Sequence, residues 1–484
     1  SWLCPALTPV PCNVDYSRFS EVLEDVSNLL RESWIESHAI DLALEGYEAG
    51  NARSREHRAR YGVESVRVAV LRALLGMPSY RELARMICSS NLLARFCGLS
   101  RIDGIRGASK STLERRCRLF SEGDLRAMLS TLTSVCGNRD LCAMTGLSEP
   151  VAMDVCLIDS SCVDANIHHP VDWVSLGDIS RTLLKAVRLI RNEGLRCRMP
   201  CEPQDFDRQM NHLGMEMTHA RRRKHAGKVR KGILRRMKKS LRIVGAHARR
   251  HCDKLKALRP QTRFSEKEAA RIITRIERML GLIDPVIAQA HERIIGGRPV
   301  SNADKVLSVH DDDVNVVVRG KASGEVEFGN TLNLCENMDG YVMDWWLYRE
   351  QAPGEPRQLR DALDRQYDLE LDSPISAVCS DRGFASRAIT RLLEESGIYD
   401  ATCPRDVSML RERTREPRFC ELQRRRASTE ARIATVMNRW LGGRPQCRSY
   451  TKRALHVGWA VLSHNLWLIA RMLSEQRKKA KAAA

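Results

Sequence analysis

The spacing of apolar side chains divides the chain into helical and strand-like regions. Residues 62–135 repeat apolar positions at helical spacing, with a break at Pro78. Residues 173–300 are again helical by period, and Ser265 followed by Glu268 is typical of a capping box at the start of one helix. From residue 305 the pattern changes, and it predicts strands over 305–310, 314–318, 325–334 and 341–349. The links between these strands are short, which indicates antiparallel neighbours.

Two further apolar runs predict buried strands that end next to an aspartate. The run 155–158 is followed at once by Asp159, and the run 375–379 is followed by Asp381. A helix over 386–396, a strand over 398–403 and a helix over 424–441 come next, and the last of these carries Glu430. An apolar helix over 456–473 ends the pattern. This order, without the long helical segment, predicts a mixed α/β sheet.

The three carboxylates of Asp159, Asp381 and Glu430 indicate metal chemistry. Rigid strand ends are suitable supports for metal-binding side chains, and a helix packed across the same end would supply a third ligand. Three hard oxygen ligands suit Mg²⁺, for which Mn²⁺ is expected to substitute. Two such ions activate a nucleophile and stabilise the leaving oxygen of a phosphodiester. A single such aspartate would instead be read as a turn or cap residue, so the argument depends on all three together.

The charge of the chain indicates a polyanionic partner. The sequence has 79 Lys and Arg against 60 Asp and Glu, a net charge of +19. Residues 221–260 alone hold 17 basic residues and one acid, Asp253, which gives +16. A helix of this charge needs counterions, and a phosphate backbone supplies them. A merely solvated basic face is the alternative, and both remain open at this point.

Other chemistry is disfavoured by the sequence. The 17 cysteines form no CxxC pair, and neither Cys197 with Cys201 nor the His247, His251, Cys252 group has the second half of a zinc site. Cys156 and Cys379 lie in apolar runs, where cysteine packs as a small hydrophobe. The first twelve residues lack the pattern of a signal peptide, and no apolar run approaches the roughly 20 residues of a membrane span. We therefore expect a cytoplasmic protein with no membrane partner.

The chain resembles the bacterial insertion-sequence DDE transposases that have a ribonuclease H-like catalytic domain. The resemblance depends on the order of several short motifs and covers most of residues 60–473. The motifs are SYREL (79–83), SKSTL (109–113), IDSSCVDANIHHPVD around Asp159, RGKASGEVEFGNTLNL from Arg319, SDRGF around Asp381, RRRASTEARI around Glu430, and the closing helix HVGWAVLSHNLWLIARML.

The resemblance implies a function and a set of site residues. Asp159, Asp381 and Glu430 would be catalytic, would hold two divalent ions, and would cut DNA at the element's inverted-repeat ends and join a 3′-OH to target DNA. Because both ends are cut and joined, the working form is expected to be a homodimer on DNA, associated with the bacterial nucleoid. The residues expected to bind DNA are Arg426, Arg319, Lys321, Arg221, Arg222, Arg223, Lys224, Arg235, Arg236, Lys238 and Lys239.

The chain departs from a Tyr-x2-Arg-x3-Glu-x6-Lys signature of related transposases at two of four positions. Arg426 and Glu430 match, whereas Gln423 stands at the Tyr position and Met437 at the Lys position. Arg426 lies one helical turn before Glu430, so it is expected either to pair with Glu430 or to contact a phosphate. A methionine cannot bind phosphate, and Arg439 is the nearest basic substitute.

The resemblance also implies the fold class. We expect an α/β protein with a ribonuclease H-like mixed sheet, a large helical insertion after the first strand, and an all-α N-terminal domain. The expected parts are 1–145 (helical, binding DNA ends), 146–182 (first part of the catalytic domain), 183–300 (basic helical insertion), 301–473 (remainder of the catalytic domain) and 474–484 (basic tail). The alternative function is a catalytically inactive or non-transposing DNA-binding protein or nuclease of the same fold.

Overall fold

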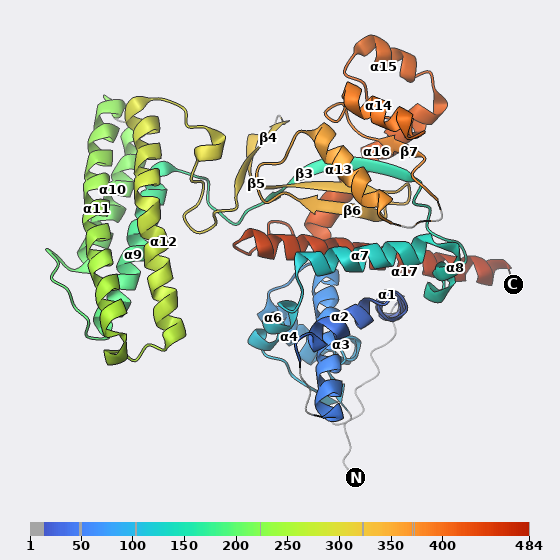
Figure 1. The fold of residues 1–484 in the computed structure, drawn as a ribbon, viewed down its shortest axis with the longest axis horizontal. Coiled ribbons are helices and arrows are strands. Elements are labelled where there is room, and N and C mark those ends of the chain that lie inside the picture. The colour runs from blue at the N-terminus through green and yellow to red at the C-terminus, as the bar shows by residue number, and fades with distance from the viewer. Residues whose placement is uncertain are drawn as a thin grey trace. The chain divides into compact units, whose positions relative to one another are not determined.

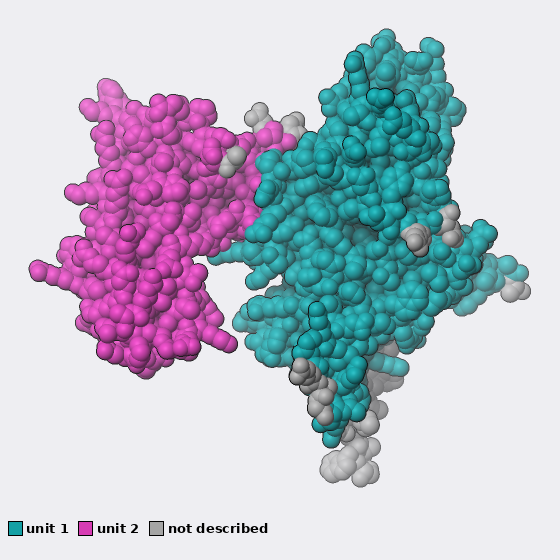
Figure 2. Space-filling model, viewed as in Figure 1, with its two compact units in different colours: residues 1–165, 330–484 teal, residues 166–329 magenta. Residues whose placement is uncertain are grey.

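The computed structural model describes residues 14–47, 51–101, 104–222, 224–321, 324–369, 371 and 373–483 (Figure 1). The fold is mixed α/β, predominantly helical, with a sheet that contains both parallel and antiparallel pairs. The chain forms two compact units, residues 1–165 with 330–484 (unit 1) and residues 166–329 (unit 2) (Figure 2). The five-part division expected from the sequence stays a prediction.

Unit 1 contains most of the sheet and most of the helices. Its helices are α1 (Val14–Glu32), α2 (Ile35–Leu44), α3 (Ala52–Leu74), α4 (Tyr80–Ser89), α5 (Asn91–Phe96), α6 (Lys110–Cys117), α7 (Glu122–Gly137), α8 (Arg139–Cys142), α13 (Glu355–Tyr367), α14 (Arg387–Glu395), α15 (Val407–Arg413), α16 (Pro417–Thr435), a π-helix (Val436–Trp440) and α17 (Tyr450–Ala483). Its strands are β1 (Ser100–Arg101), β2 (Gly104–Ile105), β3 (Val155–Asp164), β6 (Val342–Leu347), β7 (Ala377–Cys379) and β8 (Tyr399–Asp400).

Unit 2 is built mainly from four helices. These are α9 (Asp172–Asn192), α10 (Pro203–His219), α11 (Ala226–Leu258) and α12 (Glu266–Ala290), followed by a π-helix (His291–Gly296) and strand β4 (Asn315–Lys321). Strand β5 (Gly324–Glu336) begins in unit 2 and continues into unit 1. The predicted capping box is confirmed, because Ser265 and Glu268 exchange both hydrogen bonds at the start of α12.

The main sheet has six strands in the order β4-β5-β3-β7-β8, and β6 also pairs with β5. The β5–β6 pair is antiparallel, whereas the β3–β7 and β7–β8 pairs are parallel. The predicted strands over 314–318, 325–334 and 341–349 are confirmed as β4, β5 and β6, with small shifts at their ends.

The strand predicted over residues 305–310 is wrong. This segment has no strand partner in the described structure, and a short 3-10 turn (Asn302–Asp304) precedes it. The Val306 amide donates to Oε1 of Gln289 on α12 at 2.8 Å, and the Gln289 amide donates back to the Val306 carbonyl at 3.4 Å. Gln289 therefore satisfies the backbone groups that a neighbouring strand would have used, while Val309 packs into the helical core.

Alternating residues of β3 face two different hydrophobic cores. Cys156 and Ile158 belong to the large core that also contains α7, α13 and α17 residues, whereas Val155 and Leu157 belong to a smaller core with Phe419. Since side chains alternate across a strand, the β3 apolar run is buried on both faces, as expected for a central strand. Phe419 lies on α16, so the second face of the sheet is the one that α16 covers.

Buried polar groups of α17 complete the edge of the sheet. Asn465, fully buried, accepts from the Val342 amide at 2.9 Å and donates to the Val342 carbonyl at 2.8 Å. One side chain thus satisfies both backbone groups of a residue on β6 that pairs only with β5 on its other side. Among the described residues, no helix has the length and apolar character needed to cross a bilayer.

Candidate functional site

Asp159 and Asp381 occupy equivalent positions on two parallel strands. The last paired residues of β3 and β7 are Leu157 and Cys379, and each aspartate lies two residues beyond its strand's last paired position. Asp159 was expected to follow its strand, but β3 continues to Asp164, so that expectation is wrong. The hydrogen bonding to β7 does end before Asp159, which leaves the aspartate beside the open end of the shorter strand.

The alternation of side chains places Asp159 toward α16. Asp159 has the same parity along β3 as Val155 and Leu157, which pack with α16 residues Phe419 and Leu422. Cys379, two residues before Asp381, belongs to the same core. The sheet face that carries the first aspartate is therefore the face against which α16, the helix of Glu430, is packed.

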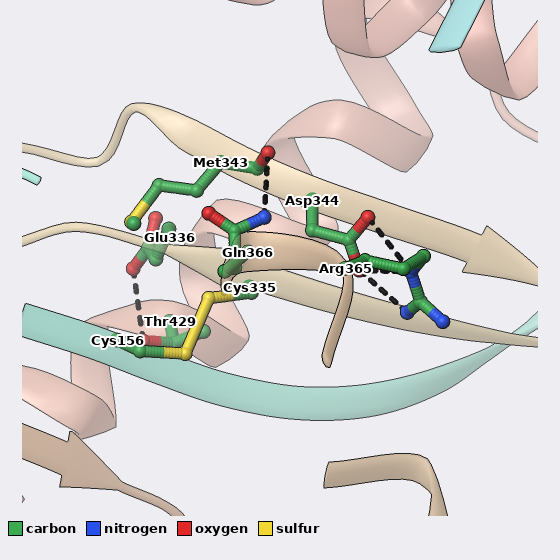
Figure 3. The surroundings of a disulfide bond; sticks show 8 residues. All are labelled: Cys156, Cys335, Glu336, Met343, Asp344, Arg365, Gln366 and Thr429. Atoms are coloured by element: carbon green, nitrogen blue, oxygen red, sulfur yellow. Dashed lines mark hydrogen bonds and ion pairs between the residues drawn. A yellow bond between two sulfur atoms is a disulfide. The ribbon is translucent and has the colours of Figure 1, made fainter. Parts of the chain in front are cut away.

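A buried ionic cluster fixes α16 against β5. The Glu336 carboxylate, fully buried, accepts from the Arg425 guanidinium at 3.1 Å, the Thr429 hydroxyl at 2.8 Å and the Arg432 guanidinium at 3.2 Å. Figure 3 shows the contact between Glu336 and Thr429. Because Thr429 immediately precedes Glu430, this cluster sets both the position and the rotation of the helix where Glu430 projects. Glu430 itself is exposed.

Gln423 fixes the same helix at the ends of β7 and β8. Its side-chain amide donates to the carbonyls of Ser380 (3.1 Å) and Ala401 (2.6 Å), and its Oε1 accepts from Arg426 Nε at 3.2 Å. Arg426 Nη1 in turn lies 3.8 Å from Asp159 Oδ2. The two sequence expectations for Arg426 were a pairing with Glu430 or a phosphate contact, and the carboxylate beside it in this structure is that of Asp159.

Electrostatic effects link the three predicted carboxylates. The pKa of Asp159 is raised from 3.8 to about 6, first by burial and then by the carboxylates of Asp381 and Glu430. The Ser160 amide, which donates to Asp159 Oδ1 at 2.7 Å, and the Arg426 guanidinium act in the opposite direction and lower this pKa. Both Asp381 and Glu430 therefore lie close enough to repel the charge of Asp159.

The residues present fit a hard divalent cation by their chemistry. The donors would be carboxylate oxygens, which Mg²⁺ and Mn²⁺ prefer, and a cation would relieve the repulsion that raises the pKa of Asp159. In the described part of the chain, no three Asp, Glu, His or Cys side chains are close enough to share one ion in their present arrangement. Arg426, 3.8 Å from Asp159, supplies the nearest positive charge in this arrangement.

A fourth acidic residue lies beside the predicted three. Glu355, in the first turn of α13, lies so close to Gly383 that a Cβ on this glycine would overlap its carboxylate. The same Cβ would be 3.0 Å from Asp381 Oδ1, which accepts from the Gly383 amide at 2.9 Å. The carboxylates of Glu355 and Asp381 are thus neighbours. The sequence analysis missed Glu355 because an acid in a first helical turn is ordinary.

A disulfide joins two neighbouring strands of the sheet. Cys156 of β3 and Cys335 of β5 form a disulfide, with their Cα atoms 6.0 Å apart (Figure 3). From the sequence, Cys156 was expected only to pack as a small hydrophobe. It is buried in the large core, as expected for that role, and is also covalently linked there.

The predicted DNA-binding residues other than Arg426 lie in unit 2. Arg222 and Lys224 are exposed and precede α11, whereas Arg235, Arg236, Lys238 and Lys239 lie on α11 itself. Arg236 is ion-paired with Glu216 of α10. Arg223 lies outside the described residues, as do the side chains of Arg221, Arg319 and Lys321.

Met437, at the lysine position of the signature, and Arg439, the basic residue nearest to it, both pack against neighbouring side chains. Met437 packs against the large core of unit 1. Arg439 stacks on the rings of Trp440 and Trp467, at 4.7 and 4.5 Å from their centroids, and burial lowers the pKa of its guanidinium.

Comparisons with protein-family models, with curated proteins and with solved structures gave no match to this chain.

Proposed function

We propose that this chain is a metal-dependent DNA strand-transfer enzyme, specifically a DDE-type transposase with a ribonuclease H-like catalytic domain. The observation that carries the proposal is the electrostatic coupling of Asp159 to both Asp381 and Glu430. These residues come from a central strand, the end of its parallel neighbour and a helix packed on the same face, far apart in the sequence. The mixed sheet, in which β5 pairs antiparallel with β6 and β3 pairs parallel with β7, supports the ribonuclease H-like part of the proposal.

Each residue of the site has a role in this proposal. Asp159, Asp381 and Glu430 would hold two Mg²⁺ or Mn²⁺ ions, which supply a polarised nucleophile and stabilise the leaving oxygen of a phosphodiester. Arg426, 3.8 Å from Asp159, balances this carboxylate when no cation is bound and would contact a phosphate of the substrate. Gln423 holds Arg426 and α16 in place. Burial of Asp159 limits water and strengthens each charge interaction.

The partners follow from the reaction. The substrates are the inverted-repeat ends and the target DNA, and paired cleavage requires two active sites, hence a homodimer on DNA. A cytoplasmic, nucleoid-associated protein is part of the same proposal. Light scattering of the chain with end DNA checks the dimer: one chain bound across two ends would contradict it.

A nuclease of the same fold without strand transfer is the second candidate. The structure uses two of the four signature positions for other purposes: Gln423 binds backbone carbonyls, and Met437 packs in the core. The position of the signature lysine, which is usually given the role of handling the DNA end, is therefore structural here. This candidate predicts cleavage without joining.

One assay separates these possibilities. The substrate is a plasmid that carries the DNA flanking the gene on both sides, incubated with the full chain, Mg²⁺ and a target plasmid. The proposal predicts cuts at both flanks and joined products, whereas cuts without joining support the nuclease, and no cuts in Mg²⁺ or Mn²⁺ contradict both.

Variants assign the activity to the carboxylates. Asp159→Asn, Asp381→Asn and Glu430→Gln should each abolish cleavage, and the triple variant should be little worse than any single one, because residues that act as a unit are not additive. Asp364→Asn is the matched control, since it removes an exposed carboxylate from α13 of the same unit. Binding of end DNA should persist in all of them. An Asp381→Asn protein that cuts at the wild-type rate would contradict the proposed site.

A further inference from the structure

Helix α11 and the π-helix after α12 line an open surface cavity that is rich in cations. The cavity has a volume of about 510 Å³ and is lined by Arg235, Lys238, Lys239 and Arg242 of α11 and by His291 of the π-helix. The four α11 residues are spaced i, i+3, i+4 and i+7, so they lie on one face of the helix. The volume falls in the range of about 300–1,000 Å³ that is typical of ligand pockets.

The four α11 cations of this cavity form no ion pair with a carboxylate among the described residues. Among the described residues, none of the four α11 side chains lies within 4.0 Å of a carboxylate. Glu292, which follows His291 in the π-helix, is ion-paired with Arg298 at 2.6 Å. By contrast, Arg236 projects from the neighbouring position of α11 and is paired with Glu216. The charge of the cavity is therefore available to an external anion.

The cavity also has features that strengthen anion binding. Ile243 and Ile295 contribute apolar lining, and Lys238 is partly buried, whereas Arg235, Lys239 and Arg242 are exposed and accessible to an external anion. Lys238 Nζ lies 2.9 Å from His291 Nδ1. Burial, and then the Arg242 guanidinium, lower the pKa of Lys238, while the Glu292 carboxylate acts in the opposite direction.

We propose that this cavity is a binding site for backbone phosphates of DNA, separate from the acidic site of unit 1. Of the eleven residues expected to bind DNA, this assigns Arg235, Lys238 and Lys239 to one site and adds Arg242 and His291. Arg236 is excluded by its ion pair. The proposal rests on DNA being the substrate of the proposed function, but it concerns affinity and not cleavage, so the two are tested by different measurements.

The test compares two variants that lose the same charge. The cavity variant is Arg235→Gln, Lys238→Gln, Lys239→Gln and Arg242→Gln in the full chain. Affinity for a fluorescent duplex of random sequence is measured by anisotropy over roughly 50–200 mM salt. The cavity variant should bind more weakly, and its plot of log K against log salt should flatten by about 0.9 for every phosphate that the protein no longer neutralises.

The control variant removes two lysines and two arginines elsewhere in the same unit. It is Lys185→Gln, Lys267→Gln, Arg271→Gln and Arg275→Gln, all exposed on α9 and α12. For this control variant, the plot of log K against log salt should keep at least most of the wild-type slope. Equal slopes for the cavity and control variants would overturn the site, as would a wild-type chain that does not bind duplex DNA. If the wild-type chain does not cut the flanking DNA but the cavity variant still binds duplex DNA more weakly with a flatter slope, only the proposed function would be overturned.

A second measurement keeps the result interpretable if a variant is unstable. The single substitutions Lys238→Gln and Arg236→Gln differ in that only the first lies in the cavity. Lys238→Gln should flatten the slope by about 0.9, and Arg236→Gln should leave it unchanged. The reverse order would contradict the assignment of the cavity. Circular dichroism verifies that each variant is folded at the assay temperature.

Discussion

Arg426 Nη1 lies 3.8 Å from Asp159 Oδ2, so a helix far along the chain supplies a cation to the carboxylate of the first central strand. This contact depends on Gln423, whose Oε1 accepts from Arg426 Nε and whose amide donates to two carbonyls at the ends of β7 and β8. Gln423 is thus the residue that joins the helix to the ends of these two strands.

Substitution of Gln423 should affect both stability and activity. Gln423→Leu leaves the carbonyls of Ser380 and Ala401 without this donor, which should lower the free energy of unfolding by about 1–3 kcal/mol. Since Arg426 also loses its support, cleavage should fall more than the stability change alone explains. Chemical denaturation and the plasmid assay measure the two effects. Glu421→Gln, exposed on the same helix, is the control. Unchanged cleavage in Gln423→Leu would show that Arg426 does not need this support.

Removal of the Asp159 charge should stabilise the protein at neutral pH. The pKa of Asp159 in the folded protein is raised from 3.8 to about 6, so its stabilising contribution is complete below pH 3.8 and is lost as pH rises through about 6. Asp159→Asn avoids this loss. When a chelator removes divalent cations, the free energy of unfolding of Asp159→Asn should exceed that of the wild type by a margin that grows with pH. This margin should be near zero at about pH 4 and about 2–3 kcal/mol above pH 7.

Thermal and denaturant unfolding at several pH values measure this advantage. Asp364→Asn, which removes an exposed carboxylate, should show no comparable change with pH. An Asp159→Asn advantage that is the same at pH 4 and pH 8 would show that the folded protein does not resist ionisation of Asp159. Added Mg²⁺ should stabilise the wild type more than this variant, since a ligand stabilises the form that binds it.

The buried Glu336 should be among the most sensitive positions of unit 1. Its carboxylate is shared by Arg425, Thr429 and Arg432, and Glu336→Ala would leave two partly buried guanidinium groups unpaired. Breaking a buried ion pair in this way typically costs about 3–5 kcal/mol. Denaturant unfolding measures the loss, and Glu395→Ala on the exposed side of α14 is a control with an expected change below about 0.5 kcal/mol. A Glu336→Ala protein of wild-type stability would show that α16 is held by its apolar contacts alone.

Glu355 should tune the metal requirement without being essential. Its carboxylate neighbours Asp381 beside Gly383, so it can orient Asp381 or a metal-bound water. Glu355→Gln should raise the Mg²⁺ concentration for half-maximal cleavage by about 10-fold or more, as substitutions around metal ligands commonly do. Glu350→Gln, exposed in the preceding loop, is the control. An unchanged Mg²⁺ requirement would remove Glu355 from the site. Gly383→Ala should reduce cleavage as well, because its Cβ would displace Glu355.

The sequence by itself determined the elements that local pattern controls. Short apolar runs identified the β3 and β7 strands, helical spacing identified α12 and α17, and the Ser265–Glu268 pair marked a helix start correctly. These features depend on residues close together in the chain, so they can be read from it. The choice of Asp159, Asp381 and Glu430 also came from the sequence, from the predicted strand ends and helix together with the order of the motifs.

Only the tertiary structure decided how distant residues meet. The parallel register that places Asp159 level with Asp381 depends on strands more than 200 residues apart, and no local pattern encodes it. The same is true of Gln289, which replaced an expected strand partner for Val306, and of Glu355, an ordinary helix-start acid until α13 packs beside Gly383. Side-chain hydrogen bonds across such distances form only when packing brings both partners together, and that is decided by the whole core.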